Sequence, residues 1–189
     1  MAEEGLIEIE NLSQSVLEGM EDGAEGSMAG AVYEGTRPLL LEVQALAAPT
    51  NVGFARRSAI GVDLSRLNMI LAVLERKAGL SLINQDIYVN IVGGLRPEGT
   101  SVDLAVALAI YSTCKGIPCS GKTIAIGEIG LTGDLRSVQN SEKIVREAAR
   151  MGFERILLPE KNAVKLKDAD SSGIRVVGVK RLTDAIKAF

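Results

Sequence analysis

The chain has 189 residues, of which 47% are apolar, a formal net charge of −3, and no histidine. A chain of this length and apolar content can bury one good core, so we expect a single domain. The absence of histidine excludes Ser-His and Cys-His catalysis and the usual zinc sites, which leaves lysine, carboxylates, serine and backbone dipoles for any chemistry.

Hydropathy and cysteine content indicate the compartment. No apolar run approaches the roughly 18 to 20 residues that a membrane span needs, and the acidic amino terminus lacks the basic start of a signal peptide. We therefore expect a soluble, cytoplasmic protein that does not contact membranes. Cys114 and Cys119 lie close together, but nothing indicates secretion, so we predict two reduced thiols.

Charge is unevenly distributed along the chain. Residues 1–26 contain eight acidic residues and no Lys or Arg, whereas residues 27–189 contain 21 basic and 16 acidic residues, a net charge of +5. We interpret residues 1–26 as a linker or the tail of a preceding domain, cut from a longer chain, and residues 27–189 as the folded domain. A mildly basic domain permits contact with phosphate backbones, although solvated lysines on an ordinary surface are the commoner explanation.

The pattern of apolar residues predicts the elements in chain order. Strands at 27–33 and 38–46 form a β-hairpin, and a strand at 58–62 leads into a helix over 64–78 that Asp63 caps. The later elements are strands at 86–92, 123–129, 134–138, 155–158 and 174–179, and helices at 101–113, 141–151 and from 183 onward. This order is α+β shading into α/β, with no internal repeat.

The segment from Gly116 to Thr123 matches the P-loop pattern G-x-x-x-x-G-K-[ST], in which Lys122 would serve a bound triphosphate. A P-loop needs strand, loop and helix in that order, because the amino terminus of the helix meets the phosphates. Here a predicted helix precedes Gly116, a predicted strand begins at Thr123, and Pro118 removes a donor. We therefore interpret the match as coincidental and predict no nucleotide site.

The glycine-rich loop that follows the strand at 86–92 has two interpretations. Thr100-Ser101-Val102-Asp103 fits the capping box [ST]-x-x-[DE], in which Thr100 and Asp103 satisfy the first amides of a helix. Alternatively, Ser101 lies at the mouth of a loop whose amides bind an oxyanion, and without histidine its only candidate general base is a lysine. The pattern itself leaves both open.

Four segments resemble the Lon protease domain in their order and spacing: Gly93–Ser101, Gly127–Val138, Ala148–Phe153 and Ile156–Pro159. This resemblance implies an α+β, Lon protease-like (ribosomal protein S5 domain 2-like) fold with mixed β-sheets and packed helices.

Upstream segments are more specific. Glu34–Pro38, Glu42–Leu46, the pair Arg56-Arg57 and Leu74–Gly79 resemble the carboxy-terminal domain of the RadA (Sms) family of bacterial DNA-repair proteins. The similarity to that family extends nearly from end to end of the chain.

The Lon resemblance can be carried over only residue by residue. Ser101 falls where Lon proteases have their nucleophile, but Asp103 stands where they have glycine. The position of the catalytic lysine is occupied by Ile144, with Lys143 one residue earlier, and one residue is about 100° of rotation on a helix. We therefore predict a pseudo-protease with no catalytic residue, the alternative being an active Ser101–Lys143 peptidase.

The RadA resemblance implies a homo-hexameric ring stacked on a ring of ATPase domains, engaged with DNA and driving branch migration in recombination, with a recombinase as a further partner. ATP, Mg and Zn would belong to parts of the protein outside this chain, and no cofactor or metal is expected in the domain itself. The candidates for phosphate contact are the basic residues of loops and helix ends: Arg37, Arg56, Arg57, Arg76 and Lys77.

Overall fold

The computed structural model describes residues 12–51, 53–166 and 173–189, so the first part of the predicted linker, residues 1–11, lies outside the described residues. The described α-helices are α1 (Leu12–Leu17), α2 (Leu64–Ala78), α3 (Asp103–Lys115), α4 (Ser141–Arg150), α5 (Glu160–Leu166) and α6 (Leu182–Ala188), with a 3₁₀ turn η1 at Val92–Gly94. The described strands are β1 (Ser27–Glu34), β2 (Arg37–Pro49), β3 (Arg57–Ile60), β4 (Gln85–Ile91), β5 (Thr123–Ala125), β6 (Glu128–Ile129), β7 (Leu135–Arg136), β8 (Arg155–Pro159) and β9 (Arg175–Val179).

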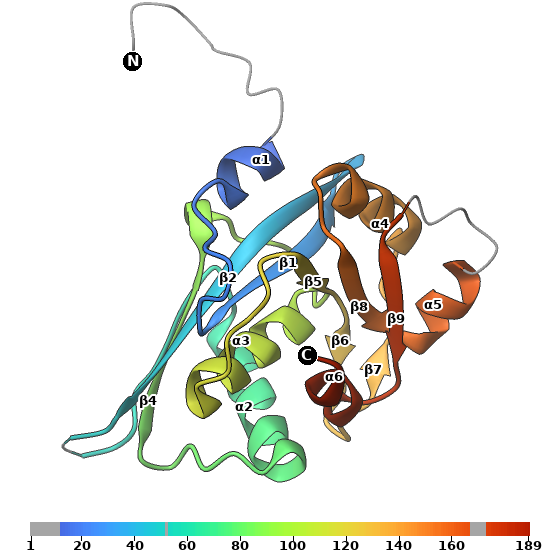
Figure 1. Cartoon of the computed structure of the whole chain (residues 1–189). Helices are drawn as coiled ribbons and strands as arrows, with labels where there is room; N and C mark the ends of the chain where they lie inside the picture. Colours follow the sequence, from blue (N-terminus) through green and yellow to red (C-terminus); the bar gives the residue numbers. More distant parts are fainter. Residues whose placement is uncertain (1–11, 52, 167–172) are drawn as a thin grey trace, which may run out of the picture.

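Seven of these strands form one mixed sheet in the order β3-β4-β2-β1-β5-β8-β9, and β6 and β7 form a separate antiparallel ribbon. The pairs β1–β2 and β2–β4 are antiparallel, whereas β3–β4, β1–β5, β5–β8 and β8–β9 are parallel. Parallel neighbours need crossover connections, which α2 supplies between β3 and β4 and α5 between β8 and β9. The chain is therefore a mixed α/β domain (Figure 1).

Apolar residues fill the space on both faces of the sheet. Along β1, Met28 and Val32 join the core that includes α2, α3 and α6, while Ala29 and Ala31 join the core of α4 and α5, because successive strand residues face opposite sides. Every residue of α3 from Leu104 to Ile110 is buried. A helix that is apolar all round fits only in such a central position.

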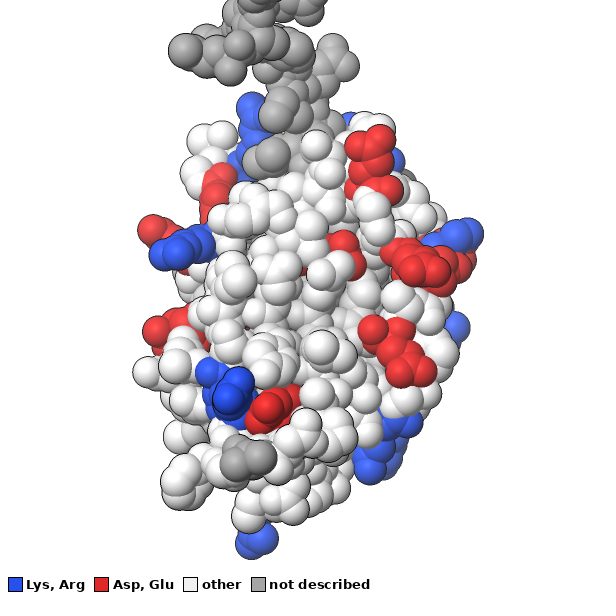
Figure 2. Space-filling view, turned by 90° about the vertical axis from the view of Figure 1, so that its left-hand side faces the viewer, with Lys and Arg blue, Asp and Glu red and all other residues white. Residues whose placement is uncertain are grey.

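Among the described elements, no helix covers the second face of the sheet at β2, β4 and β3. Leu46 and Ile60 are each 58% exposed there, and Tyr88 lies between them in the pairing order of β2, β4 and β3. A shallow pocket of about 450 Å³ lies beside these three residues. Figure 2 looks onto this side and shows a broad uncharged area across its middle.

Elements with strong local signals follow the prediction. β1 and β2 form the expected hairpin, in register from Ser27 opposite Gln44 to Glu34 opposite Arg37. The helix predicted over 64–78 is α2 with the same bounds, and the Asp63 side chain accepts a hydrogen bond from the Arg66 N–H at 2.8 Å. Its cap is therefore confirmed.

The strand predicted at 123–129 is divided in two, and this prediction is wrong in that respect. The Ile126 N–H still donates to Leu157 O of β8, but the Gly127 N–H turns to Ser101 O and Gly127 O accepts from Leu104 N. The chain therefore leaves the sheet at Gly127 to meet the start of α3. The short helix α5 was not predicted, because its seven residues directly follow a strand and carry little apolar periodicity.

The described part of the predicted linker contacts the sheet. Ser13 Oγ of α1 accepts a hydrogen bond from Leu40 N at 3.0 Å, and Val16 is buried. Gly26 O accepts from Ala45 N at 2.7 Å. Helix α1 and Gly26, at the two ends of this segment, thus contact β2.

Candidate functional site

The loop between β4 and α3 does not form the predicted capping box. The helix begins at Asp103 rather than at Ser101, and its N-cap residue, Val102, makes no side-chain cap. Thr100 Oγ1 instead donates to Glu128 Oε2 at 2.8 Å, and the Asp103 carboxylate accepts from Ile129 N at 3.0 Å. Both side chains therefore reach across to β6, and the capping prediction is wrong.

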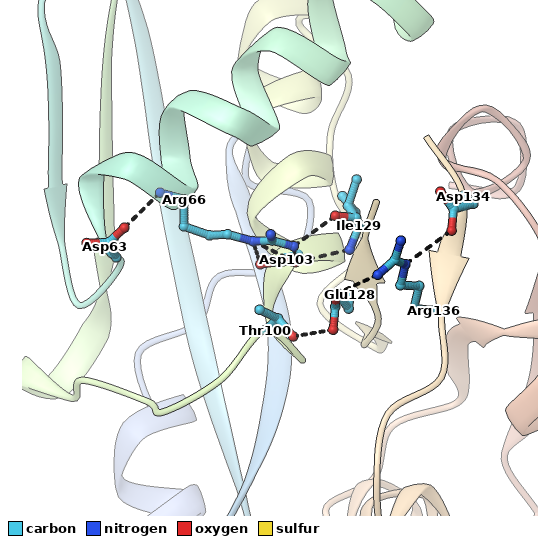
Figure 3. A network of polar contacts seen from close by, with 8 residues as sticks. All are labelled: Asp63, Arg66, Thr100, Asp103, Glu128, Ile129, Asp134 and Arg136. Carbon is cyan, nitrogen blue, oxygen red and sulfur yellow. Dashed lines mark hydrogen bonds and ion pairs between the residues drawn. The ribbon is translucent and has the colours of Figure 1, made fainter. Parts of the chain in front are cut away.

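Arg66 and Asp103 form a buried ion pair that holds β6 against the helices (Figure 3). The Asp103 side chain is 3% exposed, and Arg66 Nε lies 3.1 Å from both of its carboxylate oxygens. Arg66 Nη2 donates to Ile129 O at 2.8 Å while Asp103 accepts from Ile129 N, so the pair clamps both backbone groups of one residue.

Two opposing influences act on the pKa of the Asp103 carboxyl. Burial raises the pKa of Asp103, while the hydrogen bonds from Arg66 and from the Ile129 N–H favour its ionised form and limit the rise. The hydrogen bond to Asp103 raises the pKa of Arg66. Asp103 therefore depends on Arg66 and on the Ile129 N–H to stay charged in a buried position.

Arg66 was not predicted as a site residue, although the sequence held a signal. It lies in the first turn of α2, where a positive charge opposes the helix dipole. A cation at that end of a helix indicates a specific acidic partner.

Ser101 and Lys143 are directed to different partners. Ser101 Oγ donates to Ala31 O at 2.9 Å. Lys143 Nζ donates to Tyr33 Oη at 2.6 Å and lies 5.0 Å from the centroid of the Tyr33 ring. In this structure the two side chains of the alternative dyad therefore form hydrogen bonds to other residues and not to each other.

The pocket at Ser101 has a volume of about 300 Å³ and is mostly polar. It is lined by Tyr33, Glu98, Gly99, Thr100, Ser101, Glu128, Ser137, Val138, Gln139, Asn140 and Ile144. Ile144, the residue at the lysine position of the resemblance, lies in the wall of this pocket but is fully buried and belongs to the hydrophobic core. Asn140 adopts the left-handed conformation with φ of 54°, which asparagine tolerates better than most residues.

The segment from Gly116 to Thr123 has the helix–loop–strand order that was predicted, since it connects α3 to β5. Most of its backbone donors are already used: for example, Cys119 N donates to Ala24 O, and Gly121 N donates to the Asp22 carboxylate at 2.7 Å. Lys122 Nζ pairs with Glu154 at 2.5 Å. A carboxylate of the chain itself therefore occupies the amide that a phosphate would need.

The five predicted phosphate contacts separate into groups. Arg57 is committed internally, because its guanidinium donates to Leu82 O at 2.8 Å and to Gln85 O. Arg37 begins β2, whereas Pro49, which leads toward Arg56, ends it, so about 40 Å of extended strand lies between them. The structure thus separates Arg37 from the others.

Arg56 lies in the β2–β3 connection, whereas Arg76 and Lys77 lie in the last turn of α2, just before the α2–β4 connection. The β2–β3 connection and the α2–β4 connection are joined by the Thr50 N–H, which donates to Asn84 O at 2.9 Å. Both connections lie along the lower edge of the molecule in Figure 1. All three basic side chains are exposed, and none forms an ion pair within the part of the chain that the structure describes.

Cys114 and Cys119 are free thiols, as predicted. Burial raises the pKa of both, so neither is an activated nucleophile. Nowhere in the described ranges do three or more His, Cys, Asp or Glu side chains come together in a way that would hold a metal ion. Across the same residues, no helix combines the length and apolar content needed to cross a membrane.

Comparison with known proteins identifies the family to which the chain belongs. Residues 49–162 match the family model described as "Subunit ChlI of Mg-chelatase". The chain is 43% identical to the DNA repair protein RadA of Listeria monocytogenes and 41% identical to that of Bacillus subtilis, over 99% of its length in each case. It is 46% identical to RadA of Streptococcus pyogenes serotype M3 over 97% of its length.

The chain spans 40% of the length of each of these relatives. The predicted resemblance to RadA is confirmed. Because the matched segment covers more than half of the sequence, the chain belongs to the ChlI family and corresponds to a part of the DNA repair protein RadA.

Proposed function

We propose that this domain binds DNA within a DNA repair protein, through Arg56 of the β2–β3 connection and through Arg76 and Lys77 at the end of α2. The observation that carries the proposal is that these three cations are exposed and form no ion pair with any described residue, Arg56 in the β2–β3 connection and the other two in the last turn of α2. Unpaired guanidinium and ammonium groups attract the phosphate backbone irrespective of base sequence. The RadA relatives are named as DNA repair proteins, which supports the assignment.

A charge-removal series tests this assignment. Arg56→Gln, Arg76→Gln and Lys77→Gln together are expected to weaken binding of a 30-base-pair duplex about tenfold or more at low salt, since three phosphate contacts are lost. Fluorescence anisotropy measures the affinity.

The matched control removes the same charge at the opposite edge of the sheet. Lys161→Gln, Lys165→Gln and Arg175→Gln change α5 and β9, which lie farthest from β3 in the strand order. We expect this variant to bind within about twofold of the unmodified chain. Equal losses in both variants would contradict a localised site.

We further propose that the domain has the Lon protease-like fold but no peptidase activity. The Ser101 hydroxyl is hydrogen-bonded to Ala31 O, Lys143 is hydrogen-bonded to Tyr33, and the lysine position of the resemblance is occupied by the buried Ile144. A serine–lysine mechanism needs the amine within about 3 Å of the hydroxyl to take its proton. The alternative is an active peptidase, which would need both side chains to change partners.

A degradation assay separates the two. We expect an unfolded protein substrate to remain intact when incubated with the purified chain, and Ser101→Ala to behave identically. Degradation that Ser101→Ala abolishes would establish the peptidase instead.

The assembly proposed for the whole protein is a homo-hexameric ring that acts with ATP in recombination and branch migration in the cytoplasm. The sheet face with the exposed side chains of Leu46, Ile60 and Tyr88, beside which Glu21 and Glu25 lie, offers a partly apolar surface for contact between copies. A recombinase is the expected further partner, and ATP, Mg and Zn would be bound by parts of the protein outside this chain.

A further inference from the structure

Glu42 of β2 is a buried acidic residue in the wall of the pocket of about 450 Å³ that lies beside the exposed sheet face. Only 3% of the residue is accessible to solvent. Ser27 Oγ donates to Glu42 Oε1 at 2.7 Å, and Gln44 Nε2 donates to the same oxygen at 3.0 Å. Among the described residues, no Lys or Arg forms an ion pair with Glu42.

The second carboxylate oxygen of Glu42 opens into this pocket. Within the described ranges, both hydrogen bonds to the side chain end on Oε1, and Oε2 has no donor. No fully buried side-chain oxygen or nitrogen in those ranges lacks a partner, so Oε2 must retain access to the pocket. Burying a carboxylate without a cation is costly. A free oxygen directed into a pocket therefore indicates a ligand that brings positive charge.

The rest of the pocket suits a long side chain that carries such a charge. Leu46 and Tyr88 lie opposite each other on β2 and β4, and the exposed Ile60 of β3 extends this apolar floor. Glu21 and Glu25 are exposed at the rim and repel phosphate groups. Figure 2 shows acidic atoms recessed within the uncharged area, with no basic atoms next to them. Arginine and lysine combine an apolar stem with a cationic end, which matches this arrangement.

The acidic character of the pocket determines how two copies of the chain can meet there. In a twofold contact the same patch faces itself, which would bring the carboxylates of both copies together. A head-to-tail contact instead pairs the patch with a different surface of the next copy, and it generates a ring when the rotation closes. Lys165 of α5 and Arg175 of β9 are examples of exposed cations that form no ion pair within the described residues. The chain itself thus carries the complementary charge.

We propose that Glu42 anchors a head-to-tail contact between copies, in which an arginine or lysine of the next copy extends over Leu46 and Tyr88 and pairs with Glu42 Oε2. This inference rests on the assembly proposed above and adds to it the residue and the chemistry that hold the copies together. The site is incomplete without the cation that the second copy supplies.

Sedimentation equilibrium of the purified chain over a wide range of concentrations tests the contact. The molar mass is expected to rise above the 20.0 kDa of one chain as concentration increases. Glu42→Gln keeps an oxygen acceptor for Ser27 and Gln44 but removes the charge. We expect it to weaken association about thirtyfold or more, the effect of truncating one partner of a buried charge pair.

Glu21→Gln is the matched control, because it removes the same charge from the exposed rim of the same pocket. It should change the association constant by less than about fivefold, since water screens an exposed charge. The dissociated Glu42→Gln chain should melt at the same temperature as the unmodified chain or higher, because a buried charge without a partner has been removed. A lower melting temperature would assign the carboxylate a structural role and overturn the proposal.

Agmatine, a guanidinium group on a four-carbon chain with an amine, tests the pocket without a second copy. In nuclear magnetic resonance spectra of the dissociated, ¹⁵N-labelled chain, agmatine is expected to shift the amide signals of Gln44 and Asn90, which line the pocket. The same addition should not shift them in Glu42→Gln.

The outcomes separate the anchor from the assembly. If the chain associates and Glu42→Gln associates equally well, the assembly stands and the anchor is overturned. If the chain stays monomeric while agmatine shifts the signals, the pocket binds a cation that no second copy supplies, and the proposed contact is overturned. If the chain stays monomeric and agmatine has no effect, both the contact and the cation site fail.

Discussion

Replacing Arg66 with methionine is expected to lower the free energy of unfolding by about 3–5 kcal/mol. The change leaves the Asp103 carboxylate, only 3% exposed, without its cation, and it leaves Ile129 O without its donor. A loss of this size is a large fraction of the roughly 5–15 kcal/mol that stabilises a typical domain. Urea denaturation followed by circular dichroism measures it.

An exposed ion pair in the same network is the control. Arg136 contacts Glu128 and Asp134 at 3.8 and 3.4 Å with its side chain 62% exposed (Figure 3). Arg136→Met should cost less than about 1 kcal/mol, because water screens and replaces such contacts. Similar losses for Arg66→Met and Arg136→Met would mean that the buried pair does not stabilise the domain.

The pH dependence of the Arg66→Met variant follows from the pKa of Asp103. Burial already raises that pKa, and the variant removes the arginine that opposes the rise. A carboxyl whose pKa is higher in the folded than in the unfolded state binds its proton more tightly when folded, so stability decreases as pH rises through the folded pKa. The variant should therefore regain stability as the pH is lowered from neutral toward the acidic range.

Gly26→Ala is expected to destabilise the domain by several kcal/mol. A Cβ at this position would lie 2.2 Å from Ala45 O, and the backbone φ of 77° is unfavourable for a side chain. The Gly26 N–H also donates to Ser112 Oγ of α3 at 2.8 Å, so the strand cannot move away without losing that bond.

Gly23→Ala separates the cost of the steric clash from the cost of the unfavourable φ. Gly23 has nearly the same φ, 79°, but a Cβ there would meet nothing within 4 Å. Its cost should be the backbone strain alone, about 1–2 kcal/mol. Thermal unfolding of both variants measures the difference, and equal costs would show that close packing against β2 is not what fixes Gly26.

Elements whose bounds are set by signals within one stretch of sequence were predicted correctly. The bounds of α2 follow from the Asp63 cap, the apolar spacing and the left-handed Gly79, all within one stretch of chain. The role of Asp103 could not be predicted in this way. Its partners, Arg66 and Ile129, lie 37 and 26 residues away in the sequence. The sequence of this helix matches the capping-box pattern, but in the structure the helix is not capped by those side chains.

The separation of Ser101 from Lys143 also depends on the tertiary structure. The register of α4 indicated that Lys143 points away from the lysine position of the resemblance. Lys143 donates a hydrogen bond to Tyr33, and Ser101 donates one to Ala31 O. Both acceptors lie on β1, which is distant in sequence, so the sequence alone did not predict these contacts. The exposure of Arg56, Arg76 and Lys77 was expected, because they lie in a loop and at a helix end. The hydrogen bonds from the Arg57 guanidinium to the backbone carbonyls of Leu82 and Gln85 could not be predicted, because these acceptors are far from it in the sequence.

The salt dependence of duplex binding tests the DNA-binding function most directly. The logarithm of the binding constant of the unmodified chain should fall with the logarithm of salt concentration with a slope of about −3 or steeper, at about 0.9 per phosphate contact. Removing the charges of Arg56, Arg76 and Lys77 should flatten that slope by about 3. A binding constant independent of salt, or a slope unchanged in the variant, would contradict the account.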